Sequence, residues 1–340
     1  MALALWQAFP GARLLTSVYD PAGTFPGFAE AVVETSWLQR VPTARRDPRR
    51  ALPLMASAFD RLRVDDVDAV VCSSTGWAHG VATRAPKVVY CHNPARWLYQ
   101  PQDYLRSQPA AVRTALRTLT PRLTGWDQRA AQSADRYLVN STVVRQRVLA
   151  TYGIKATVVP PPVSLDVTAT QEAPAGVEPG FFLVVGRARG YKNTEAVCEA
   201  FAELPDQRLV VVGGLPSGDW PGNLTGLVDV RDAELAWLYA HCQALVSVAY
   251  EDFGLTPVEA NAFGKPALVL RAGGFLDTLD EGVSGWFVES VEPAAVRKTV
   301  RQLLAAPLDP APIREHAARY SPAAFATAVQ DAVEQAVRPC

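Results

Sequence analysis

The chain has 340 residues, of which 49% are hydrophobic and 20% are charged, and its formal net charge is −1. This length is long for one hydrophobic core and sufficient for two domains. No uninterrupted apolar run reaches the roughly 18 residues of a membrane span, so no transmembrane helix is expected. The five cysteines are dispersed without a C-x-x-C pair. An odd, dispersed set favours reduced thiols in the cytoplasm over a disulfide framework.

Charge is distributed unevenly along the chain. Residues 1–165 contain 20 Lys and Arg against 11 Asp and Glu, whereas the remaining residues contain 13 against 23. Much of the basic excess comes from arginines interleaved with leucine and tryptophan, namely Arg106, Arg113, Arg117, Arg122 and Arg129. This stretch is either a basic amphipathic surface for an anionic membrane or lipid-phosphate acceptor, or a solvated helical region paired with the acidic second half. No nucleic-acid recognition motif accompanies it, so nucleic acid is not an expected partner.

The first half of the chain alternates helical patterns with β-rich apolar runs. Residues 3–9 form the first helical pattern, and no basic residue precedes them, so a signal peptide is not expected. The predicted strands of a first sheet are residues 14–19, 69–72, 88–90, 137–139 and 157–159. Three prolines at 160–162 end this domain. An Asp-Val-Asp triplet at 66–68 has the form of a metal–diphosphate ligand set, but it precedes a strand, away from where sites form, and is predicted to be a turn.

The second half continues the alternation after a linker at residues 166–179, which is rich in Thr, Glu, Pro and Gly. The predicted strands here are residues 181–185, 209–212, 227–228, 245–248 and 267–270, with helices between them. A last helix is predicted over residues 321–337. The pattern predicts an α/β fold with two Rossmann-like domains on parallel sheets.

The block VVYCHNPARWLY at residues 88–99 brings polar side chains to the end of a predicted strand. Open α/β sheets form their sites at the carboxyl ends of strands. His92 is therefore a candidate site residue, and Arg96 is a candidate for ordering the loop or meeting a phosphate. The four histidines show no spacing typical of a zinc site, so no metal is expected.

Two cations follow the predicted strand at residues 181–185. Gly186 permits a tight turn, and Arg187 and Lys192 bracket the short loop before the next helix. Arginine offers a planar fork and lysine a point charge, a combination that suits a diphosphate. The alternative is that both are ordinary solvated loop charges.

The segment EDFGLTPVEANAFGKP at residues 251–266 carries the most chemical information. Glu251 precedes a turn that can start a helix, and Glu259 lies one or two helical turns inside it. The N–H groups of such a helix start suit a phosphate. Carboxylates beside an anion are repelled by it and should accept hydrogen bonds from hydroxyl groups instead. A ligand with phosphates in the middle and a polyol ring at each end is a sugar nucleotide.

The spacing of Glu251 and Glu259, written EDFG-x-x-PVEA, resembles the signature of the retaining family 4 glycosyltransferases, and within them the bacterial mannosyltransferase-like branch. The resemblance implies a GT-B architecture, with Glu251 on donor sugar hydroxyls and Glu259 on the ribose. It also implies that His92 bonds the donor sugar near the reacting carbon and that Arg187 and Lys192 bind the diphosphate. The further donor-binding residues that it implies are Phe253, Gly254, Leu255 and Thr256.

Two features depart from the usual family pattern. Gly273 and Gly274 follow a strand end and are candidates for close approach to a ligand. The departure in this segment is Asp277, which stands where the family usually has glutamate. The family also begins with a strand and a glycine-rich loop, whereas this chain opens inside the expected first helix. A segment of about 20 residues is therefore expected to be missing, which would leave the first domain less stable and donor turnover poor.

The sequence thus predicts an acceptor-side domain at residues 1–165, a linker at 166–179, a nucleotide-sugar donor domain at 180–319 and a C-terminal helix at 320–340 that crosses back to the first domain. The predicted activity is retaining, metal-independent transfer of a hexose, with mannose the leading candidate, from a GDP- or UDP-linked donor to a glycan or lipid-linked acceptor. No cofactor is expected, and the location is cytoplasmic or at the inner membrane face. The alternatives are a truncated pseudoenzyme that still binds nucleotide, and a sugar-nucleotide epimerase, which fits the phosphate loops but not the two glutamates.

Overall fold

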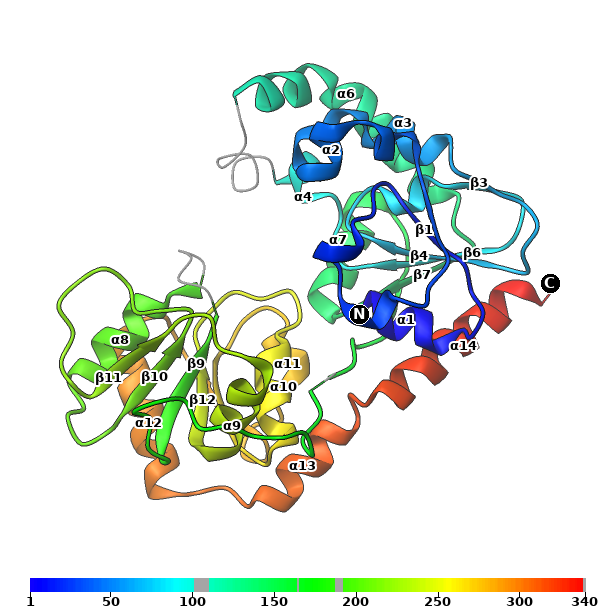
Figure 1. The fold of residues 1–340 in the computed structure, drawn as a ribbon. Coiled ribbons are helices and arrows are strands. Elements are labelled where there is room, and N and C mark those ends of the chain that lie inside the picture. Colours follow the sequence, from blue (N-terminus) through cyan, green and yellow to red (C-terminus); the bar gives the residue numbers. More distant parts are fainter. Residues whose placement is uncertain (101–109, 164, 187–191, 339–340) are drawn as a thin grey trace. The chain divides into compact units, whose positions relative to one another are not determined.

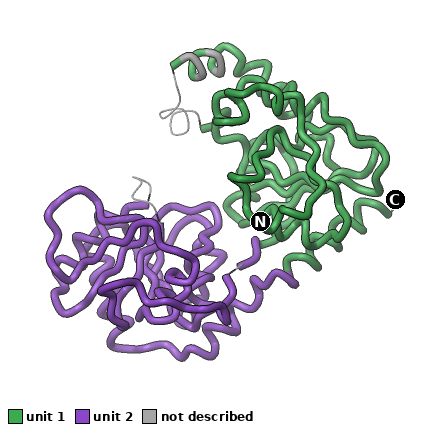
Figure 2. The backbone as a smooth tube through the Cα atoms, in the orientation of Figure 1, with its two compact units in different colours: residues 1–160, 325–340 green, residues 161–324 purple. Residues whose placement is uncertain are grey.

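The computed structural model describes residues 1–338 except for residues 101–109, 164 and 187–191. The chain divides into two compact units, which Figure 2 colours separately. Unit 1 comprises Met1–Pro160 and Phe325–Cys340, and unit 2 comprises Pro161–Ala324. Each unit has its own parallel sheet and its own hydrophobic core.

The central sheet of unit 1 has four parallel strands in the order β4-β6-β7-β8. The strands are β4 (Val70–Ser74), β6 (Lys87–Cys91), β7 (Arg136–Val139) and β8 (Thr157–Val158). All five residues of β6 are buried, as expected for an inner strand of a parallel sheet that is covered on both faces. This buried strand places His92 at the carboxyl edge of the sheet.

The strand expected at residues 14–19 lies outside this sheet. It appears as β1 (Leu14–Thr16), which pairs in parallel with β2 (Val33–Thr35) in a separate two-stranded sheet. Another small sheet joins β3 (Arg63–Val64) to β5 (Ala82–Thr83). The side chains of β1 are only partly buried, unlike those of an inner strand. The prediction that residues 14–19 belong to the first sheet is wrong, because their backbone partners come from the segment that follows them closely in sequence.

Unit 1 is completed by helices and short 3-10 segments. The helices are α1 (Ala2–Ala8), α2 (Pro42–Arg46), α3 (Met55–Asp60), α4 (Arg96–Tyr99), α6 (Ala110–Gln132), α7 (Thr142–Tyr152) and most of α14 (Pro322–Val337). The 3-10 segments are η1 (Pro21–Gly23), η2 (Pro26–Phe28), η3 (Trp37–Arg40), η4 (Pro48–Leu54) and η5 (Ala78–Gly80).

The two ends of α7 are set by residues of the local sequence. The Ser141 hydroxyl accepts from the N–H of Val144, and Gly153 ends the helix in a left-handed conformation with φ 70°.

Helix α14, red in Figure 1, packs against the central sheet of unit 1. Phe325, Val329 and Ala332 share a hydrophobic cluster with Tyr90 of β6 and Leu138 of β7. The rings of Phe325 and Tyr90 meet edge-on, with centroids 5.7 Å apart. The helix begins in unit 2, so it carries the end of the chain onto unit 1.

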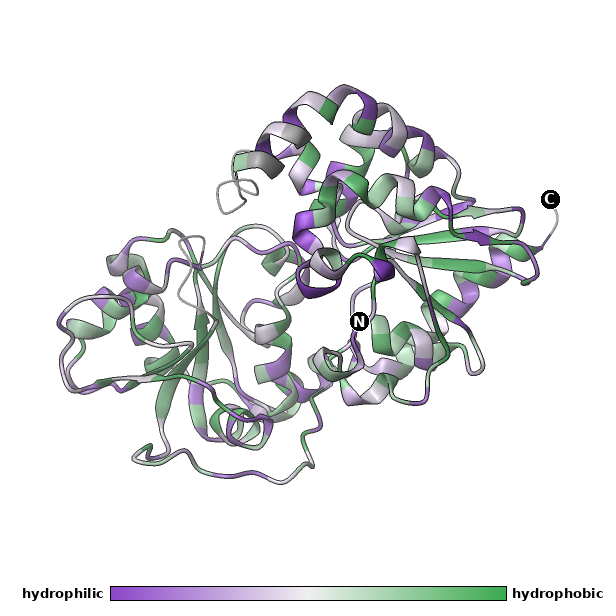
Figure 3. Cartoon of the chain, turned by 45° about the horizontal axis from the view of Figure 1, so that its top comes forward, coloured by the Kyte–Doolittle hydropathy of each residue, from purple (hydrophilic) through white to green (hydrophobic). Residues whose placement is uncertain are grey.

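The sheet of unit 2 has six parallel strands in the order β11-β10-β9-β12-β13-β14. They are β9 (Phe181–Val185), β10 (Leu209–Val212), β11 (Leu224–Leu227), β12 (Cys242–Ser247), β13 (Ala267–Leu270) and β14 (Gly285–Val288). Counted along the chain, this is a 3-2-1-4-5-6 arrangement whose order reverses between β9 and β12. The strands are mostly hydrophobic (Figure 3), as expected where helices cover both faces.

Three strands of unit 2 differ from the sequence-based expectation. β11 and β12 each start three residues before the predicted 227–228 and 245–248, and β14 is absent from the prediction. β14 begins at Gly285, where an added Cβ would lie 1.9 Å from the carbonyl oxygen of Ala267. Glycine therefore allows β14 to approach β13, although glycine weakens a strand signal in sequence.

The helices of unit 2 are α8 (Thr194–Ala202), α9 (Asp232–His241), α10 (Leu255–Ala262), α11 (Phe275–Thr278), α12 (Pro293–Ala305) and α13 (Pro310–Ala318). The first four each lead from one strand to the next, whereas α12 and α13 come after β14, the last strand. Within the ranges that the structure describes, neither unit contains a helix with the length and apolar character needed to cross a membrane.

Candidate active site

The strand order of unit 2 reverses between β9 and β12, which pair with each other directly. In an open α/β sheet, ligands bind beyond the carboxyl ends of the two strands at such a point. The chain leaves β9 toward Lys192 and leaves β12 toward Glu251. Two predicted donor-binding segments that lie 59 residues apart in sequence therefore begin at adjacent strand ends.

Lys192 and Glu251 form an ion pair at these strand ends. Nζ of Lys192 donates to Oε1 of Glu251. The two side chains are 21% and 24% exposed, so the pair is partly shielded from water but still accessible to a ligand. Partial burial strengthens such a pair relative to one on the open surface. A cation and a carboxylate thus stand together at the position where the topology favours ligand binding.

Asn193 ties the start of α8 to the end of β12. Its Nδ2 donates to the carbonyl oxygen of Val248 at 2.9 Å. Its backbone is left-handed, with φ 50°, a conformation that asparagine tolerates better than most residues. Asn193 stands at the N-cap position of α8, but its side chain makes no capping hydrogen bond to that helix. It joins the two strand ends instead.

Gly273 and Gly274, after β13, support the turn that carries Glu251. The N–H of Gly274 donates to the carbonyl oxygen of Glu251 at 2.8 Å. A Cβ on Gly273 would lie 2.4 Å from that same oxygen, and a Cβ on Gly274 would lie 2.4 Å from the carbonyl oxygen of Asp252. The close approach at these glycines is therefore made by the chain's own backbone. A side chain at either position would displace the segment that holds Glu251.

Gly254 turns the chain from Glu251 into α10. Its φ of 85° lies in the left-handed region, and an added Cβ would stand 2.3 Å from the Phe275 ring. Helix α10 then starts with Leu255, which is exposed, and Thr256. The first N–H groups of a helix have no acceptor within it, and they carry partial positive charge. This helix start is thus suited to an anion.

Phe253 and Asp277 make contacts within unit 2. Phe253 is buried, and its ring meets that of Tyr320 edge-on with centroids 5.8 Å apart. The Tyr320 hydroxyl donates to the backbone carbonyl of Asp277 at 2.8 Å. Because the Phe253 side chain lies in the core, a ligand contact from this residue would have to come from its backbone. Asp277 lies in the first turn of α11, where a carboxylate is favoured by the helix dipole.

Glu259 lies on the second turn of α10 and contacts a tyrosine from α9. Tyr239 is fully buried, and its hydroxyl donates to Oε2 of Glu259 at 2.6 Å. Burial raises the pKa of Glu259 above its ordinary value, and the hydrogen bond from Tyr239 acts in the opposite direction. Burial and then the charge of Glu259 raise the pKa of Tyr239, so the phenol remains a donor. Sequence reasoning missed Tyr239, because no motif marks it.

In unit 1, three strand ends fix His92. Oγ of Ser73 on β4 lies 2.9 Å from Nε2 of the ring. The backbone N–H of His92 donates to the carbonyl oxygen of Ser74 at 3.0 Å, and Nδ2 of Asn140, after β7, donates to the carbonyl oxygen of His92 at 3.1 Å. Arg96 opens α4 in the same loop. Ser73 and Asn140 were missed, although both lie at carboxyl ends of predicted strands.

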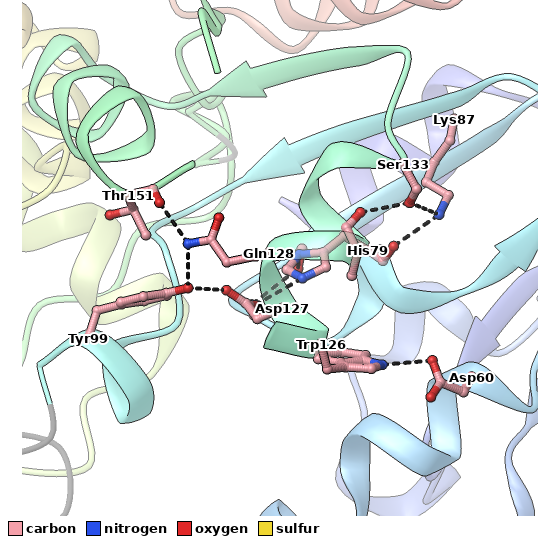
Figure 4. Close-up of polar contacts among 12 residues, drawn as sticks. Asp60, His79, Lys87, Tyr99, Trp126, Asp127, Gln128, Ser133 and Thr151 are labelled. Carbon is pink, nitrogen blue, oxygen red and sulfur yellow. Dashed lines mark hydrogen bonds and ion pairs between the residues drawn. The ribbon is translucent and has the colours of Figure 1, made fainter. Parts of the chain in front are cut away.

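A buried polar network joins α4, α6 and η5 in unit 1 (Figure 4). Nε2 of His79 lies 3.0 Å from Oδ1 of Asp127, and the Tyr99 hydroxyl donates to Oδ2 of Asp127 at 2.8 Å. Nε2 of Gln128 donates to the Tyr99 hydroxyl at 3.2 Å and to the carbonyl oxygen of Thr151 at 2.8 Å. Since Tyr99 ends α4, the network fixes the helix that follows the His92 loop.

The same network includes the residue types of a hydrolase triad. Oγ of Ser74 lies 3.0 Å from Nδ1 of His79, whose other nitrogen faces Asp127. None of these three residues is more than 1% exposed. A nucleophile has to reach its substrate. In this conformation the three residues therefore hold unit 1 together and do not form a hydrolytic site.

Arg187 lies outside the described residues. The Asp-Val-Asp triplet at 66–68 forms a bend between β3 and β4, at the amino end of β4. In the described parts of both units, no group of three or more His, Cys, Asp or Glu side chains could hold a metal ion.

Two family models match consecutive parts of the chain. Glycosyltransferase Family 4 matches residues 17–167, and Glycosyl transferases group 1 matches residues 168–325. The chain belongs to the GT-B glycosyltransferases. The predicted fold class, two α/β domains with parallel sheets, is confirmed by these matches and by the central parallel sheet of each unit.

Curated relatives carry the name D-inositol 3-phosphate glycosyltransferase. The protein from Mycobacterium sp. (strain KMS) is 30% identical over 226 residues, which is 57% of this chain and 51% of the relative. The protein from Nocardiopsis dassonvillei is 33% identical over 222 residues, or 55% and 51%. This GT-B chain spans about half the length of the curated relatives that it matches.

Solved structures resemble the chain over nearly its whole length. The alignment with sucrose-phosphate synthase from Thermosynechococcus elongatus covers 98% of this chain and 91% of the synthase, with a TM-score of 0.69 and 19% identity. HepE from Anabaena, in complex with UDP and glucose, covers 98% and 94%, with a TM-score of 0.67 and 17% identity. At these identities the likeness establishes the GT-B fold alone.

Proposed function

We propose that this GT-B glycosyltransferase transfers a hexose from a nucleoside diphosphate sugar to an acceptor hydroxyl. The observation that carries the proposal is the ion pair between Lys192 and Glu251 at the strand-order reversal of unit 2. The start of α10 follows Glu251 within a few residues and supplies N–H donors for an anion. The Lys192 cation and the start of α10 suit a diphosphate, and the Glu251 carboxylate can accept hydrogen bonds from sugar hydroxyls.

Each candidate side chain has a distinct role in this proposal. Lys192 and the start of α10 would neutralise the charge that develops on the leaving diphosphate. Arg187 would supply a second cation, as its position in the sequence indicates. Glu251 would accept hydrogen bonds from the donor sugar, and Glu259 from the ribose. His92, held by the strand ends of unit 1, would bond the donor sugar near the reacting carbon.

The transfer is proposed to be retaining and metal-independent, on the basis of the family 4 resemblance. The acceptor oxygen would attack the anomeric carbon from the face on which the diphosphate departs. The bond between that carbon and the phosphate oxygen breaks as the new glycosidic bond forms. The leaving phosphate takes the proton of the acceptor hydroxyl, so no protein carboxylate is needed as a nucleophile.

The donor is proposed to be a UDP- or GDP-linked hexose. The HepE complex contains UDP and glucose, which supports a uridine donor. The EDFG-x-x-PVEA segment resembles the mannosyltransferase-like branch, which supports mannose. The acceptor is proposed to be a glycan or lipid-linked sugar, and the names of the curated relatives add D-inositol 3-phosphate as a candidate. Thermal-shift screening against UDP- and GDP-linked hexoses, followed by product analysis, separates these options.

Replacing each glutamate with glutamine should separate sugar binding from nucleoside binding. Glu251→Gln should lower sugar-nucleotide turnover about tenfold or more and leave the affinity for free nucleoside diphosphate nearly unchanged. Glu259→Gln should lower both by about tenfold, because the ribose is present in both ligands. Calorimetry and initial rates measure the two quantities, with exposed Glu315→Gln as the matched control. Equal losses of nucleoside diphosphate affinity in the two site variants would contradict the assigned roles.

Helix α6 is proposed as a contact surface for an anionic membrane. Arg117, Arg122 and Arg129 are exposed on this helix, whereas Leu123 and Ala130 are buried against unit 1. Each basic residue near an anionic surface contributes about 1 kcal/mol to binding. The solvent-exposed side of α6, away from its buried apolar residues, is therefore basic.

Replacing Arg117, Arg122 and Arg129 together with glutamine should weaken binding to phosphatidylserine vesicles by about a hundredfold. Vesicle co-sedimentation measures the effect, and phosphatidylcholine vesicles are the neutral control. Equal binding of the unmodified chain to both kinds of vesicle would refute the proposed membrane contact.

A further inference from the structure

Tyr239 and Glu259 form a contact that the proposed reaction does not by itself require. Tyr239 lies on α9 with no exposed surface, and its hydroxyl donates to Oε2 of Glu259 at 2.6 Å. The Tyr239 ring stacks on Phe263, with centroids 5.8 Å apart and planes inclined by 13°. Ring packing therefore fixes where the hydroxyl points, and the hydroxyl in turn fixes one oxygen of the carboxylate.

The contact leaves the other carboxylate oxygen for a ligand. Among the described residues, Tyr239 is the hydrogen-bond partner found for Glu259, and it uses Oε2 alone. Glu259 is partly buried, and removing a carboxylate from water is costly unless hydrogen bonds stabilise its charge. Burial pushes the pKa of Glu259 upward and the Tyr239 hydrogen bond pulls it downward. The phenol thus opposes the effect of burial on the carboxylate and occupies Oε2, so Oε1 is the oxygen that a ligand can meet.

We propose that Tyr239 is a positioning residue for nucleoside recognition, which makes Glu259 select ribonucleotides over deoxyribonucleotides. The phenol orients the carboxylate so that its second oxygen accepts a hydrogen bond from the ribose diol. This inference rests on the proposed function, in which Glu259 contacts the ribose. The inference adds that Tyr239 holds the Glu259 carboxylate in place. It also adds the consequence, which is that the site prefers ribose over deoxyribose in the nucleoside.

Calorimetric titration of the full chain with UDP, GDP and their 2′-deoxy and 3′-deoxy counterparts tests the inference. A hydrogen bond to a charged group is worth roughly 1.5–3 kcal/mol, so the unmodified chain should prefer one ribonucleotide over at least one deoxy form by about tenfold or more. Tyr239→Phe keeps the ring and removes the hydroxyl. It should reduce this preference to within about threefold, by weakening ribonucleotide binding and leaving deoxynucleotide binding unchanged.

A purely structural role for Tyr239 would change the affinity for ribo and deoxy ligands equally. Tyr137→Phe removes another buried tyrosine hydroxyl, in unit 1, and should leave the preference intact. A Tyr239→Phe variant that keeps the full preference would overturn the inference while leaving the proposed function in place. If the unmodified chain binds neither UDP nor GDP, or shows no ribo preference, the ribose assignment of Glu259 fails and the inference fails with it.

A double variant keeps the inference testable if Tyr239→Phe alone does not fold. Tyr239→Phe combined with Glu259→Gln leaves no carboxylate buried without its donor. Because Tyr239 acts through Glu259, the double variant should match Glu259→Gln in UDP and GDP affinity to within about twofold. A further tenfold loss in the double variant would show that Tyr239 acts independently of Glu259, and would overturn the inference.

Discussion

Replacing Lys192 with alanine should lower the turnover of a nucleoside diphosphate sugar by about a hundredfold or more. Removal of a preorganised group that stabilises developing negative charge typically costs about 10²–10³ in kcat. The same change should weaken the binding of free nucleoside diphosphate by about tenfold, the value of a charge-assisted hydrogen bond. It also deprives Glu251 of its cationic partner.

Initial rates of nucleoside diphosphate release and calorimetry measure the two effects of Lys192→Ala. Lys298→Ala is the matched control, since Lys298 is exposed on α12, and it should change neither quantity. Lys192→Arg keeps the charge but changes its geometry, so it should retain more affinity than activity. We expect Arg187→Ala to act in the same direction as Lys192→Ala. Unchanged affinity in both alanine variants would remove these cations from the site.

Replacing Asp127 with alanine should lower the free energy of unfolding of unit 1 by about 2–6 kcal/mol, because each of two buried donors left without an acceptor costs about 1–3 kcal/mol. Asp127 is fully buried and contacts both His79 and Tyr99. The alanine variant leaves the imidazole nitrogen and the phenol without their acceptor in the interior. The loss should loosen α4, and through it the loop that carries His92.

Hydrogen exchange measured by mass spectrometry can assign the loss from Asp127→Ala to one unit. Peptides from β6 and α6 should exchange faster, whereas peptides from the sheet of unit 2 should be unchanged. Asp127→Asn keeps an acceptor oxygen and should lose less stability. Asp65→Ala removes an exposed carboxylate of the same unit, paired with Arg63, and should have no resolvable effect. Equal protection in Asp127→Ala and the unmodified chain would contradict a structural role for the network.

The elements that sequence predicts well are those with strong local signals. The apolar residues of β6, β9 and β13 form short runs that are almost entirely buried, and such runs between turn signals indicate inner strands of a parallel sheet. The positions of Lys192 and Glu251 after β9 and β12 follow from the rule that parallel sheets form their sites at carboxyl ends. The prediction of a GT-B fold depended on these strands and on the EDFG-x-x-PVEA segment.

The elements that sequence misses depend on contacts between distant segments. β1 has an apolar sequence like that of a core strand, but only its pairing with β2 reveals that it lies outside the central sheet. β14 is hidden because its first residue, Gly285, is required by the close approach of β13 rather than by strand propensity. The contact between Tyr239 and Glu259 spans 20 residues and two helices, and nothing in the local sequence of either helix encodes it.

The products formed from UDP- and GDP-linked hexoses test most directly whether the Lys192–Glu251 site of unit 2 supports glycosyl transfer. The full chain is incubated with each donor and a panel of glycan, lipid-linked and inositol phosphate acceptors. Nucleoside diphosphate release gives the rate, and NMR gives the anomeric configuration of the product. We expect release from at least one donor, a product with the donor's anomeric configuration, and release about a hundredfold slower or more in Lys192→Ala. Tight binding of UDP or GDP without any release would instead identify a pseudoenzyme, and an inverted product would contradict the retaining mechanism.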